Sequence, residues 1–466
     1  MKTKGIIFSA IYFCLIFLIA ASASGQQTYS FGAQQAVEYA LKNSAQVKNA
    51  LLDIDIQRQT NKEITALAYP QLSASVNAGY NPDVAVQTFP NFIAAGTYGV
   101  LMEQGVKDAN GNPIQSPADF GFIQAQFGSK YTASGSIDAS QLLFDGQVFV
   151  GLQARKASIQ FSTATAEVTK EQIKTNVYKI YYQLVVGKKQ IESLDANISR
   201  FENLLNDTRE IYKNGFAEKL DVDKVEVQLN NLRTEKLKAE NQLEAGYAGL
   251  KFLMSLPQKD QLILTDTLSE QELKSNLLDS SYSYNDRKEF QQLTFLEKLN
   301  GFNIKRYKLS KLPTVALSAN YSKNAQRQKF DFFRGEYFTS SFVGLRINFP
   351  LFDGGAKNAR IGMARLNLQK TRNNLEQFKL SVDNDVEQSR INIKSALVTM
   401  DSQKKNIELA EKVYNTTKLK YEQGLGSNQE IYTAQTELKV AQNNYYSSLY
   451  DAINARIDYL RAVGKL

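Results

Sequence analysis

The tetrapeptide Leu-Phe-Asp-Gly at residues 143–146 occurs again at residues 351–354, and this repetition is the feature that decides the fold. A second pair of related motifs follows in the same order. Tyr-Lys-Asn-Gly stands at 212–215 and Tyr-Glu-Gln-Gly at 421–424. The two pairs are offset by 208 and 209 residues. Two motifs that recur in one order at nearly one spacing indicate a duplicated structural unit.

A third, weaker pair shows where the two copies differ in length. Tyr69-Pro70 is echoed at Leu312-Pro313, which is an offset of 243 residues. The first copy therefore carries about 35 additional residues between its proline and its Phe-Asp-Gly motif. We expect this additional length within residues 81–131, as a loop.

Apolar residues at heptad spacing predict long paired helices around each Tyr-x-x-Gly motif. Sustained spacing of this kind is typical of coiled-coil packing. No proline follows Pro350, so one helix is expected over residues 355–423, with a length of roughly 100 Å. A helix of that length predicts a projection rather than a compact globular domain. After the first motif the heptad residues are Val222, Leu229, Leu243 and Leu250, and their counterparts are Ile431, Leu438, Ala452 and Tyr459.

Four segments alternate between apolar and small polar residues and are expected to be strands. About ten alternating residues can cross a bilayer as a tilted strand, but a soluble sheet with one exposed face shows the same alternation. Four strands are too few to close a membrane barrel, and lipid does not tolerate open sheet edges. If the strands are embedded, several copies of the chain must share one barrel. The four segments are residues 71–80, 132–144, 313–322 and 341–351.

The N-terminus predicts export from the cytoplasm. Lys2 and Lys4 precede an apolar run over residues 6–20, and Ala21-Ser22-Ala23 offers small residues for cleavage. This pattern is typical of a secretory signal peptide over residues 1–25, and an uncleaved anchor is the alternative. No later stretch approaches the roughly 20 apolar residues of a spanning helix. Any passage through a membrane therefore has to use strands.

Composition argues against most enzyme classes. The chain has no histidine and no tryptophan, and its one cysteine, Cys14, lies in the predicted signal peptide. Zinc sites, Ser-His-Asp triads and Cys-His pairs all need residues that are missing. No pair of acids stands out from the helical surface as a hydrolase site would require. We therefore predict a non-enzymatic protein with no catalytic, cofactor-binding or metal-binding residues.

The charge pattern does not favour nucleic acid as a partner. The formal net charge is +8, but basic and acidic residues are interleaved along the chain and form no block. A solvated helical surface explains this distribution better than a binding patch does.

In their order and duplication, these motifs resemble the TolC-like outer-membrane efflux family, whose members serve tripartite efflux and type I secretion systems. The resemblance covers nearly the whole mature chain. It implies a mainly α protein with membrane β-structure, built on a duplicated helix–strand–strand–helix–helix unit. Three copies would form a homotrimer with one shared twelve-stranded barrel in outer-membrane lipid, and long antiparallel coiled-coil helices would form a tunnel in the periplasm.

The resemblance also implies the function and the partners. The chain would be a passive exit duct for substrates delivered by an inner-membrane pump and a periplasmic adaptor. Drugs, metal cations and polypeptides all remain open as substrates.

The expected organisation follows from the duplication and the resemblance together. Residues 26–256 form the first repeat, residues 257–283 a linker and residues 284–466 the second repeat. Residues 81–131 would face outward. The periplasmic tips would lie at about 212–221 and 421–430.

The tip turns are the first candidate site. Glycine tolerates the positive φ that a tight turn between helices needs, so Gly215 and Gly424 can close these turns. The family places such turns where the adaptor docks, which makes Tyr212, Gly215, Tyr421 and Gly424 candidate adaptor contacts.

Two acids near the tips are candidates for a constriction. The resemblance implies a carboxylate ring at Asp221 and Glu430, each six residues after a tip glycine. The alternative is an ordinary acid at a helix start, stabilised by the helix dipole. The best-studied relatives have an arginine and a further aspartate near the second turn, where this chain has Gly426 and Thr433.

The repeated Phe-Asp-Gly motifs mark the junctions between strand and helix. Asp145 and Asp353 are expected to cap or turn the chain at these points rather than to catalyse a reaction. The junction residues are Phe144, Asp145, Gly146, Phe352, Asp353 and Gly354.

The alternative function is a periplasmic coiled-coil adaptor or scaffold without a pore. Such a protein would carry a small β domain between its helices and no duplicated spanning strands. The duplication counts against it.

Overall fold

The structure is a computed structural model that describes residues 27–126, 128–266, 273–274 and 281–466. The signal peptide expected at residues 1–25 lies outside the described residues. The chain divides into two compact units. We call the unit formed by Thr60–Ala154 and Phe302–Ala364 the sheet unit, and the remainder the helical unit.

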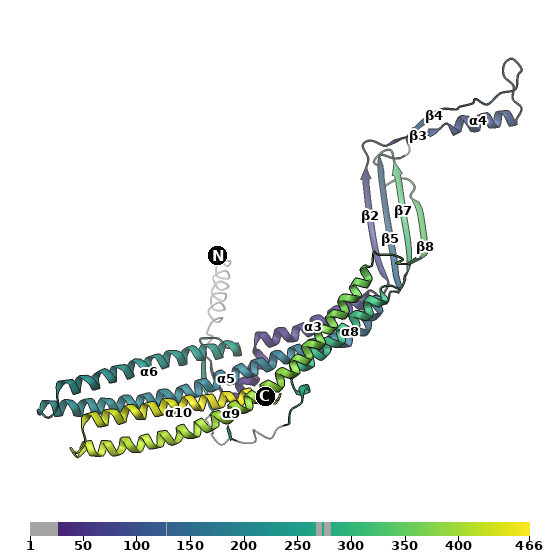
Figure 1. Cartoon of the computed structure of the whole chain (residues 1–466). Helices are drawn as coiled ribbons and strands as arrows, with labels where there is room; N and C mark the ends of the chain where they lie inside the picture. The colour runs from purple at the N-terminus through teal and green to yellow at the C-terminus, as the bar shows by residue number, and fades with distance from the viewer. Residues whose placement is uncertain (1–26, 127, 267–272, 275–280) are drawn as a thin grey trace, which may run out of the picture. The chain divides into compact units, whose positions relative to one another are not determined.

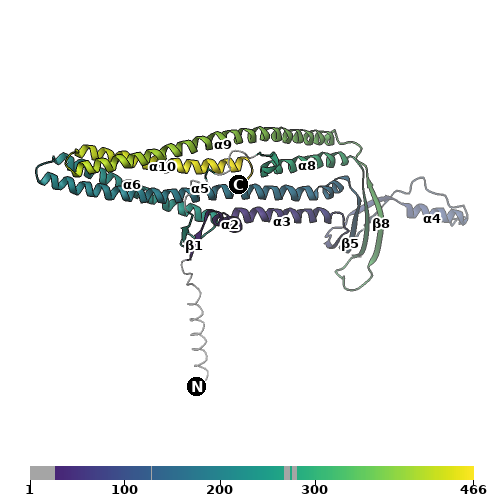
Figure 2. The same ribbon diagram turned by 90° about the horizontal axis from the view of Figure 1, so that it is seen from below.

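Two helical hairpins dominate the helical unit and lie side by side (Figure 1, Figure 2). The first hairpin is α5 (Gly146–Lys213) with α6 (Lys219–Met254), and the second is α9 (Ala356–Glu422) with α10 (Asn428–Ala462). The helix expected over residues 355–423 is therefore confirmed almost to the residue. The heptad pattern and the absence of proline explain this length, because nothing in that stretch interrupts the backbone hydrogen bonds.

Shorter helices precede the strands of each repeat. In the first repeat these are α2 (Ala33–Asn43) and α3 (Ala45–Ala66), and in the second repeat α8 (Lys288–Leu309) follows a 3₁₀ turn, η1 (Tyr284–Asp286). Among the described residues, no helix has both the length and the apolar character needed to cross a membrane.

The sheet unit contains one antiparallel sheet with the strand order β2-β5-β7-β8. The strands are β2 (Gln71–Tyr80), β5 (Tyr131–Phe144), β7 (Thr314–Arg327) and β8 (Phe338–Asn348). β7 runs beyond the expected end at residue 322 because β5 offers cross-strand partners as far as Tyr131. β8 ends at Asn348 rather than at residue 351. Pro350 has no N–H to donate to the ladder, which explains the early end.

The residues expected to form a plain outward loop, 81–131, have secondary structure of their own. β3 (Val86–Pro90) pairs with β4 (Phe122–Gln126), and between them lies α4 (Phe92–Glu103). Asn91 caps α4 by accepting a hydrogen bond from the Ala94 N–H at 3.0 Å. The strands are five residues long and α4 is apolar on most positions, so neither has the periodicity that would reveal it in the sequence.

A second small sheet was also not expected. β1 (Thr28–Phe31) pairs in parallel with β6 (Gln261–Leu264), and β6 lies within the segment read as a linker. Tyr181 of α5 is fully buried beneath this sheet. Its hydroxyl donates to the Phe31 carbonyl at 2.9 Å and accepts from the Asp266 N–H at 3.1 Å. The Tyr181 side chain therefore links the end of β1 and the segment that follows β6 to α5.

A further apolar cluster joins the two hairpins. It contains residues of all four long helices, among them Phe201, Leu229, Tyr414 and Leu438, each of which is buried. The two repeats thus share one core in the helical unit.

The close approach of two backbones at the first junction generates a prediction about Gly146. A Cβ atom at this position would lie 2.6 Å from both the carbonyl oxygen and the Cβ of Leu309, at the end of α8. Gly146→Ala should therefore overpack the junction and cost about 1–3 kcal/mol, seen as a lower melting temperature of the detergent-purified protein by circular dichroism. Gly362→Ala is the matched control, because Gly362 lies within α9 with nothing within 4 Å of an added Cβ. Equal melting temperatures for both variants would contradict this account of Gly146.

Candidate functional site

Both hairpin turns have the hydrogen bonds of a Schellman motif. Gly215 has φ +78° and donates to the Tyr212 carbonyl at 2.9 Å, while Phe216 donates to Ile211 at 3.0 Å. In the second turn Gly424 has φ +73° and donates to the Tyr421 carbonyl at 2.9 Å. Only a residue that tolerates positive φ fits at the glycine position, which explains why both turns use glycine.

The two tip tyrosines occupy equivalent positions but have different environments. Tyr421 is half-buried against the apolar cluster that joins the hairpins, and burial raises the pKa of its phenol. Tyr212 is 44% exposed. The difference arises because the end of α9 near Tyr421 packs against the first hairpin of the same chain. Within the described residues, no other hairpin packs against the corresponding face of α5 near Tyr212.

The two candidate constriction acids both lie in the first turn of a helix. The Asp221 carboxylate accepts a hydrogen bond from the Glu218 N–H at 3.3 Å and lies 4.0 Å from the Lys224 ammonium. Glu430 is exposed, and its backbone N–H donates to the Ser427 hydroxyl at 3.2 Å. Both positions are favourable for an acid because of the helix dipole. The single chain holds these acids at equivalent points of separate hairpins.

Gly426 and Thr433 have local roles near the second tip. The Gly426 N–H donates to the Lys420 carbonyl at 3.1 Å, and a Cβ at residue 426 would lie 3.1 Å from the Tyr421 nitrogen. A larger residue there would have to displace the end of α9. The Thr433 hydroxyl donates to the Gln429 carbonyl at 2.8 Å within α10.

The strand-to-helix junctions confirm the expected capping by aspartate. Asp145 accepts from the Gln147 N–H at 2.7 Å, and Asp353 accepts from Gly355 at 3.1 Å and from Lys357 at 2.9 Å. The neighbouring aromatic residues differ: Phe144 packs against Phe149 at 5.6 Å between ring centroids, whereas Phe352 is 91% exposed. The glycines also differ, because Gly354 has φ +63° whereas Gly146 is needed for close packing.

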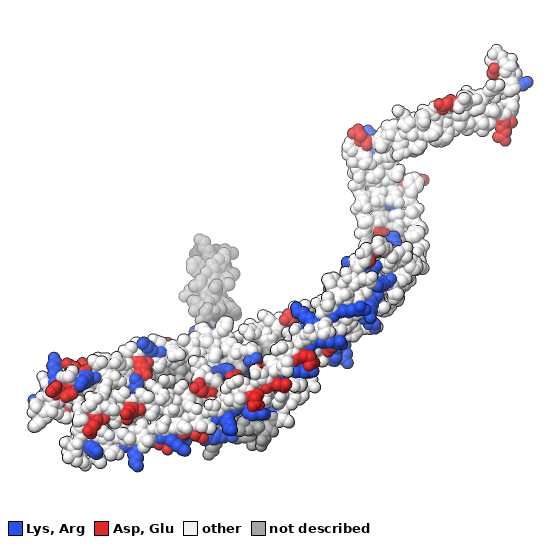
Figure 3. Space-filling model, viewed as in Figure 1, with Lys and Arg blue, Asp and Glu red and all other residues white. Residues whose placement is uncertain are grey.

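The four-stranded sheet has one mainly apolar face and one mainly polar face, although Lys323 lies among the apolar rows and Phe342 lies opposite Asn320 among the polar rows. Cross-strand partners lie on the same face. One apolar row runs Leu72, Ala139, Ala319 and Val343. Leu72 and Val343 are more than 70% exposed, and Figure 3 shows few charged atoms on the visible side of this region. A large apolar surface of this kind needs something to cover it.

The polar face carries a hydrogen-bonded network that the sequence analysis missed. Asn320 donates to the Asp138 carboxylate at 2.7 Å, and the Ser136 hydroxyl donates to the same group at 3.0 Å. Ser75 and Ser136 lie 3.0 Å apart. Asp138 could have been found, because it falls between Ser136 and Ser140 in the same alternation. Arg346 lies on this face too, opposite Ala316.

The described part of the chain contains no candidate metal centre. Among the described residues, no group of three or more histidine, cysteine, aspartate or glutamate side chains could hold a metal ion.

Comparison with known proteins agrees with these features. The family model "Outer membrane efflux protein" matches residues 303–465. The alkaline protease secretion protein AprF of Pseudomonas aeruginosa is 20% identical over 449 residues, which cover 95% of this chain and 84% of AprF. The proteases secretion protein PrtF of Dickeya chrysanthemi is 19% identical over 213 residues, which cover 44% of this chain and 45% of PrtF.

A solved structure agrees over nearly the whole fold. The CmeC outer membrane channel of Campylobacter jejuni superposes with a TM-score of 0.72 at 15% identity. The match covers 93% of this chain and 85% of the CmeC chain.

The turn geometry generates a prediction about the tips. Gly215→Ala and Gly424→Ala each force an L-residue into the left-handed region, at a cost of about 1–2 kcal/mol. We expect faster hydrogen exchange confined to the ends of the affected hairpin, measured by mass spectrometry on peptides that span the turn. Gly249→Ala in α6 is the control, since an added Cβ there meets nothing within 4 Å. Unchanged exchange at both tips would show that the glycines are not required by the turn.

Proposed function

We propose that this chain, a member of the TolC-like outer-membrane efflux family, is a passive exit duct in the outer membrane for substrates delivered by an inner-membrane pump and a periplasmic adaptor. The observation that carries this proposal is the four-stranded sheet. It exposes one apolar face and leaves an outer strand at each edge, β2 and β8.

Lipid and further copies of the chain together would cover the apolar face of this sheet and bond the backbone groups at its edges. Lipid covers apolar side chains, but it cannot bond the free N–H and C=O groups of an edge strand. Strands from other copies can. Because the four strands alternate in direction, β8 of one copy meets β2 of the next in an antiparallel pair. Three copies would give the twelve-stranded barrel, with its Ser and Asn side chains facing a wet lumen.

The remaining parts of the duct follow from this assembly. The helical hairpins extend the conduit through the periplasm, where the turns at Tyr212–Gly215 and Tyr421–Gly424 meet the adaptor. The duct performs no chemistry, and the pump supplies the energy. AprF and PrtF are by name protease secretion proteins, which favours polypeptides as one substrate class without excluding drugs or metal cations.

Asp221 and Glu430 would narrow the periplasmic end. Each lies at the start of the second helix of a hairpin. Three copies would place six carboxylates around one axis, which favours cations over anions and binds multivalent cations.

A scaffold without a pore is the competing proposal. It does not explain why the sheet exposes Val76 at 87% and Leu72 at 73%, since a soluble sheet would bury one face in the protein.

The proposal predicts a heat-modifiable trimer in the outer membrane. The full chain with its signal should fractionate with that membrane, and unheated detergent extracts should run as a trimer that collapses on heating. Leu345→Arg on the apolar face should cost roughly 2–4 kcal/mol and deplete this band. Ser318→Arg, in the adjacent row on the polar face, should keep it. A soluble periplasmic monomer, or equal loss in both variants, would contradict an embedded sheet.

The constriction predicts a change in conductance. Asp221→Ala combined with Glu430→Ala should raise single-channel conductance in planar bilayers and weaken block by multivalent cations, because six charges leave the narrow end. Glu244→Ala combined with Glu408→Ala removes the same charge from exposed positions away from the tips and serves as the control. If both double variants conduct and block like the unaltered protein, the two acids act only at their helix starts.

A further inference from the structure

Two phenylalanines interrupt the mainly polar face of the sheet. Phe342 and Phe338 of β8 lie opposite Asn320 and Asn324 of β7, in rows that otherwise hold short polar side chains. Both phenylalanines are exposed, at 60% and 62%. In the proposed duct this face lines a wet lumen, where an exposed aromatic side chain gains little from burial. Packing within the chain therefore does not account for these two residues.

The Phe342 ring lies along β8, over Gly344. Residues two apart in a strand point to the same face of the sheet. A Cβ atom added to Gly344 would lie 2.8 Å from the Cε1 atom of Phe342 and closer still to its Cζ atom. The ring therefore occupies the place that a side chain at residue 344 would take. It forms an apolar platform on a polar surface.

The same row of the sheet contains Asp138, which is the only acid in the four strands. Asn320 donates to its Oδ1 atom at 2.7 Å, and the Ser136 hydroxyl donates to its Oδ2 atom at 3.0 Å. A carboxylate has about four acceptor sites, so both oxygens can accept further hydrogen bonds. The full row runs Ser73, Asp138, Asn320 and Phe342.

The negative charge of Asp138 has no base beside it on this face. Arg346 is the only basic residue at a polar-face position of the four strands, and it follows Phe342 by four residues on β8. This spacing places Arg346 about 14 Å from the Asp138 row along the strand direction. Salt screens the interaction of exposed charges beyond roughly 8–10 Å. Arg346 therefore does not neutralise Asp138.

Asp138 and Phe342 are placed to bind two ends of one molecule. β7 separates β5 from β8 (Figure 1). The two residues therefore lie about 10 Å apart across the sheet, at roughly 4.8 Å per strand. Between them, Asn320 binds Asp138 through its amide nitrogen, which leaves the amide oxygen to accept from a ligand N–H. A molecule with a positive charge at one end and an apolar group at the other matches this row.

We infer that Asp138, Asn320 and Phe342 form a binding site in the barrel lumen for organic cations that carry an aromatic or bulky alkyl group. The carboxylate pairs with the cationic group. The Phe342 ring contacts the apolar group and also attracts the cation through its π face. The inference rests on the proposed function and deepens it, because the row faces a lumen only if the sheet belongs to a duct. Three copies place three such sites at one level of the barrel.

Other classes of ligand fit this row less well. The Asp138 charge repels anions, and a neutral apolar molecule would cover the carboxylate without pairing it. A metal ion needs several oxygen ligands, and no cluster of acids in the described part of the chain could supply them. The tip acids Asp221 and Glu430 would attract cations by charge alone. The site in the sheet differs from them because it also selects for the apolar group.

Block of single-channel current tests the site. The full chain is purified as the trimer and reconstituted in planar bilayers, with tetraphenylphosphonium or tetramethylammonium as the probe. Tetraphenylphosphonium should block at a several-fold lower concentration, because only this cation has aromatic groups that contact Phe342. Phe342→Ala should weaken block by tetraphenylphosphonium several-fold and change block by tetramethylammonium little. Asp138→Asn should weaken block by both cations, since both lose the carboxylate.

Phe338→Ala is the matched control. It removes the same ring from the same face, in a row without an acid, and should leave block by tetraphenylphosphonium nearly unchanged. Gly344→Ala is a second variant, which keeps the Phe342 ring but displaces it, and it should weaken block in the same direction as Phe342→Ala. Each variant should still run as a heat-modifiable trimer, which separates loss of the site from loss of the fold.

The outcomes separate this inference from the proposed function. Channels that both cations block equally, or equal effects of Phe342→Ala and Phe338→Ala, would overturn the site and leave the duct intact. If Asp221→Ala with Glu430→Ala abolishes block by tetraphenylphosphonium while Phe342→Ala leaves it unchanged, the cation binds at the tips, and the site is again overturned. A trimer that forms no channels would overturn the proposed function and this inference with it.

Discussion

Satisfying the backbone hydrogen bonds at the edges of the four-stranded sheet is the constraint on which the rest of this molecule depends. Among the described residues, β2 and β8 each have a strand partner on one side only. Water could satisfy such an edge, but lipid cannot. Lipid would cover the exposed apolar face, and in lipid the backbone groups of the edge strands need hydrogen bonds from further strands. In the proposed duct, trimerisation is therefore a condition for a stable sheet rather than an addition to a finished fold.

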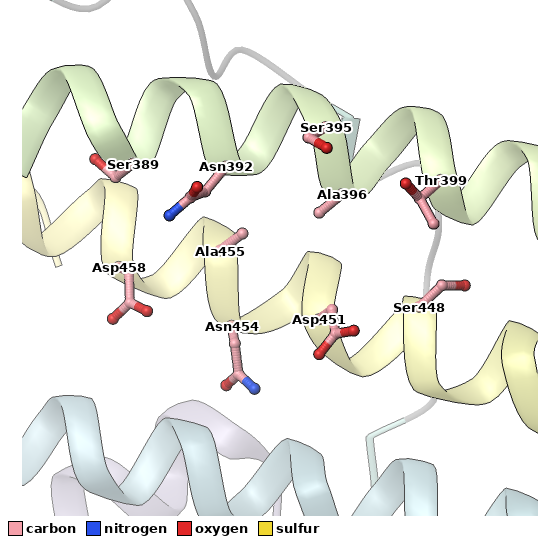
Figure 4. Close-up of a pocket in the computed structure, with 10 residues that line it drawn as sticks. All are labelled: Ser389, Asn392, Ser395, Ala396, Thr399, Ser448, Asp451, Asn454, Ala455 and Asp458. Atoms are coloured by element: carbon pink, nitrogen blue, oxygen red, sulfur yellow. The ribbon is translucent and has the colours of Figure 1, made fainter.

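The duplication gives each chain two equivalent hairpins. Within a single chain these two hairpins have different surroundings. Residues of α10 help to line a groove between α5 and α6, while the corresponding groove between α9 and α10 is lined, among the described residues, by those two helices alone (Figure 4). Tyr421 is half-buried whereas Tyr212 is exposed. In each case one copy of a surface has its partner inside the chain, and the other copy would find it in the next chain. A ring of identical chains, as in the proposed duct, would give both copies of each surface a partner.

The tip acids show that one residue can serve both local structure and function. The Asp221 carboxylate accepts a hydrogen bond from the Glu218 N–H at the start of α6, and Glu430 lies in the first turn of α10. Helix-dipole stabilisation accounts for an acid at each position. The same carboxylates can also serve a constriction, since they would face one another only after three chains assemble. Asp138 and Arg346 on the polar face of the sheet are further charges that assembly would repeat around the lumen.

The sequence by itself determined the periodic parts of this protein. Long heptads and ten-residue alternation carry their own signal, so the hairpins and the faces of the sheet could be predicted, together with the capping roles of Asp145 and Asp353. β1, β6 and the β3–α4–β4 segment could not, because four- or five-residue strands and a short apolar helix have no clear period. Only the tertiary structure decided which copy of each repeated surface is already occupied. That distinction depends on contacts between residues some 200 positions apart, and no local pattern records which of two equivalent faces has its partner in the same chain.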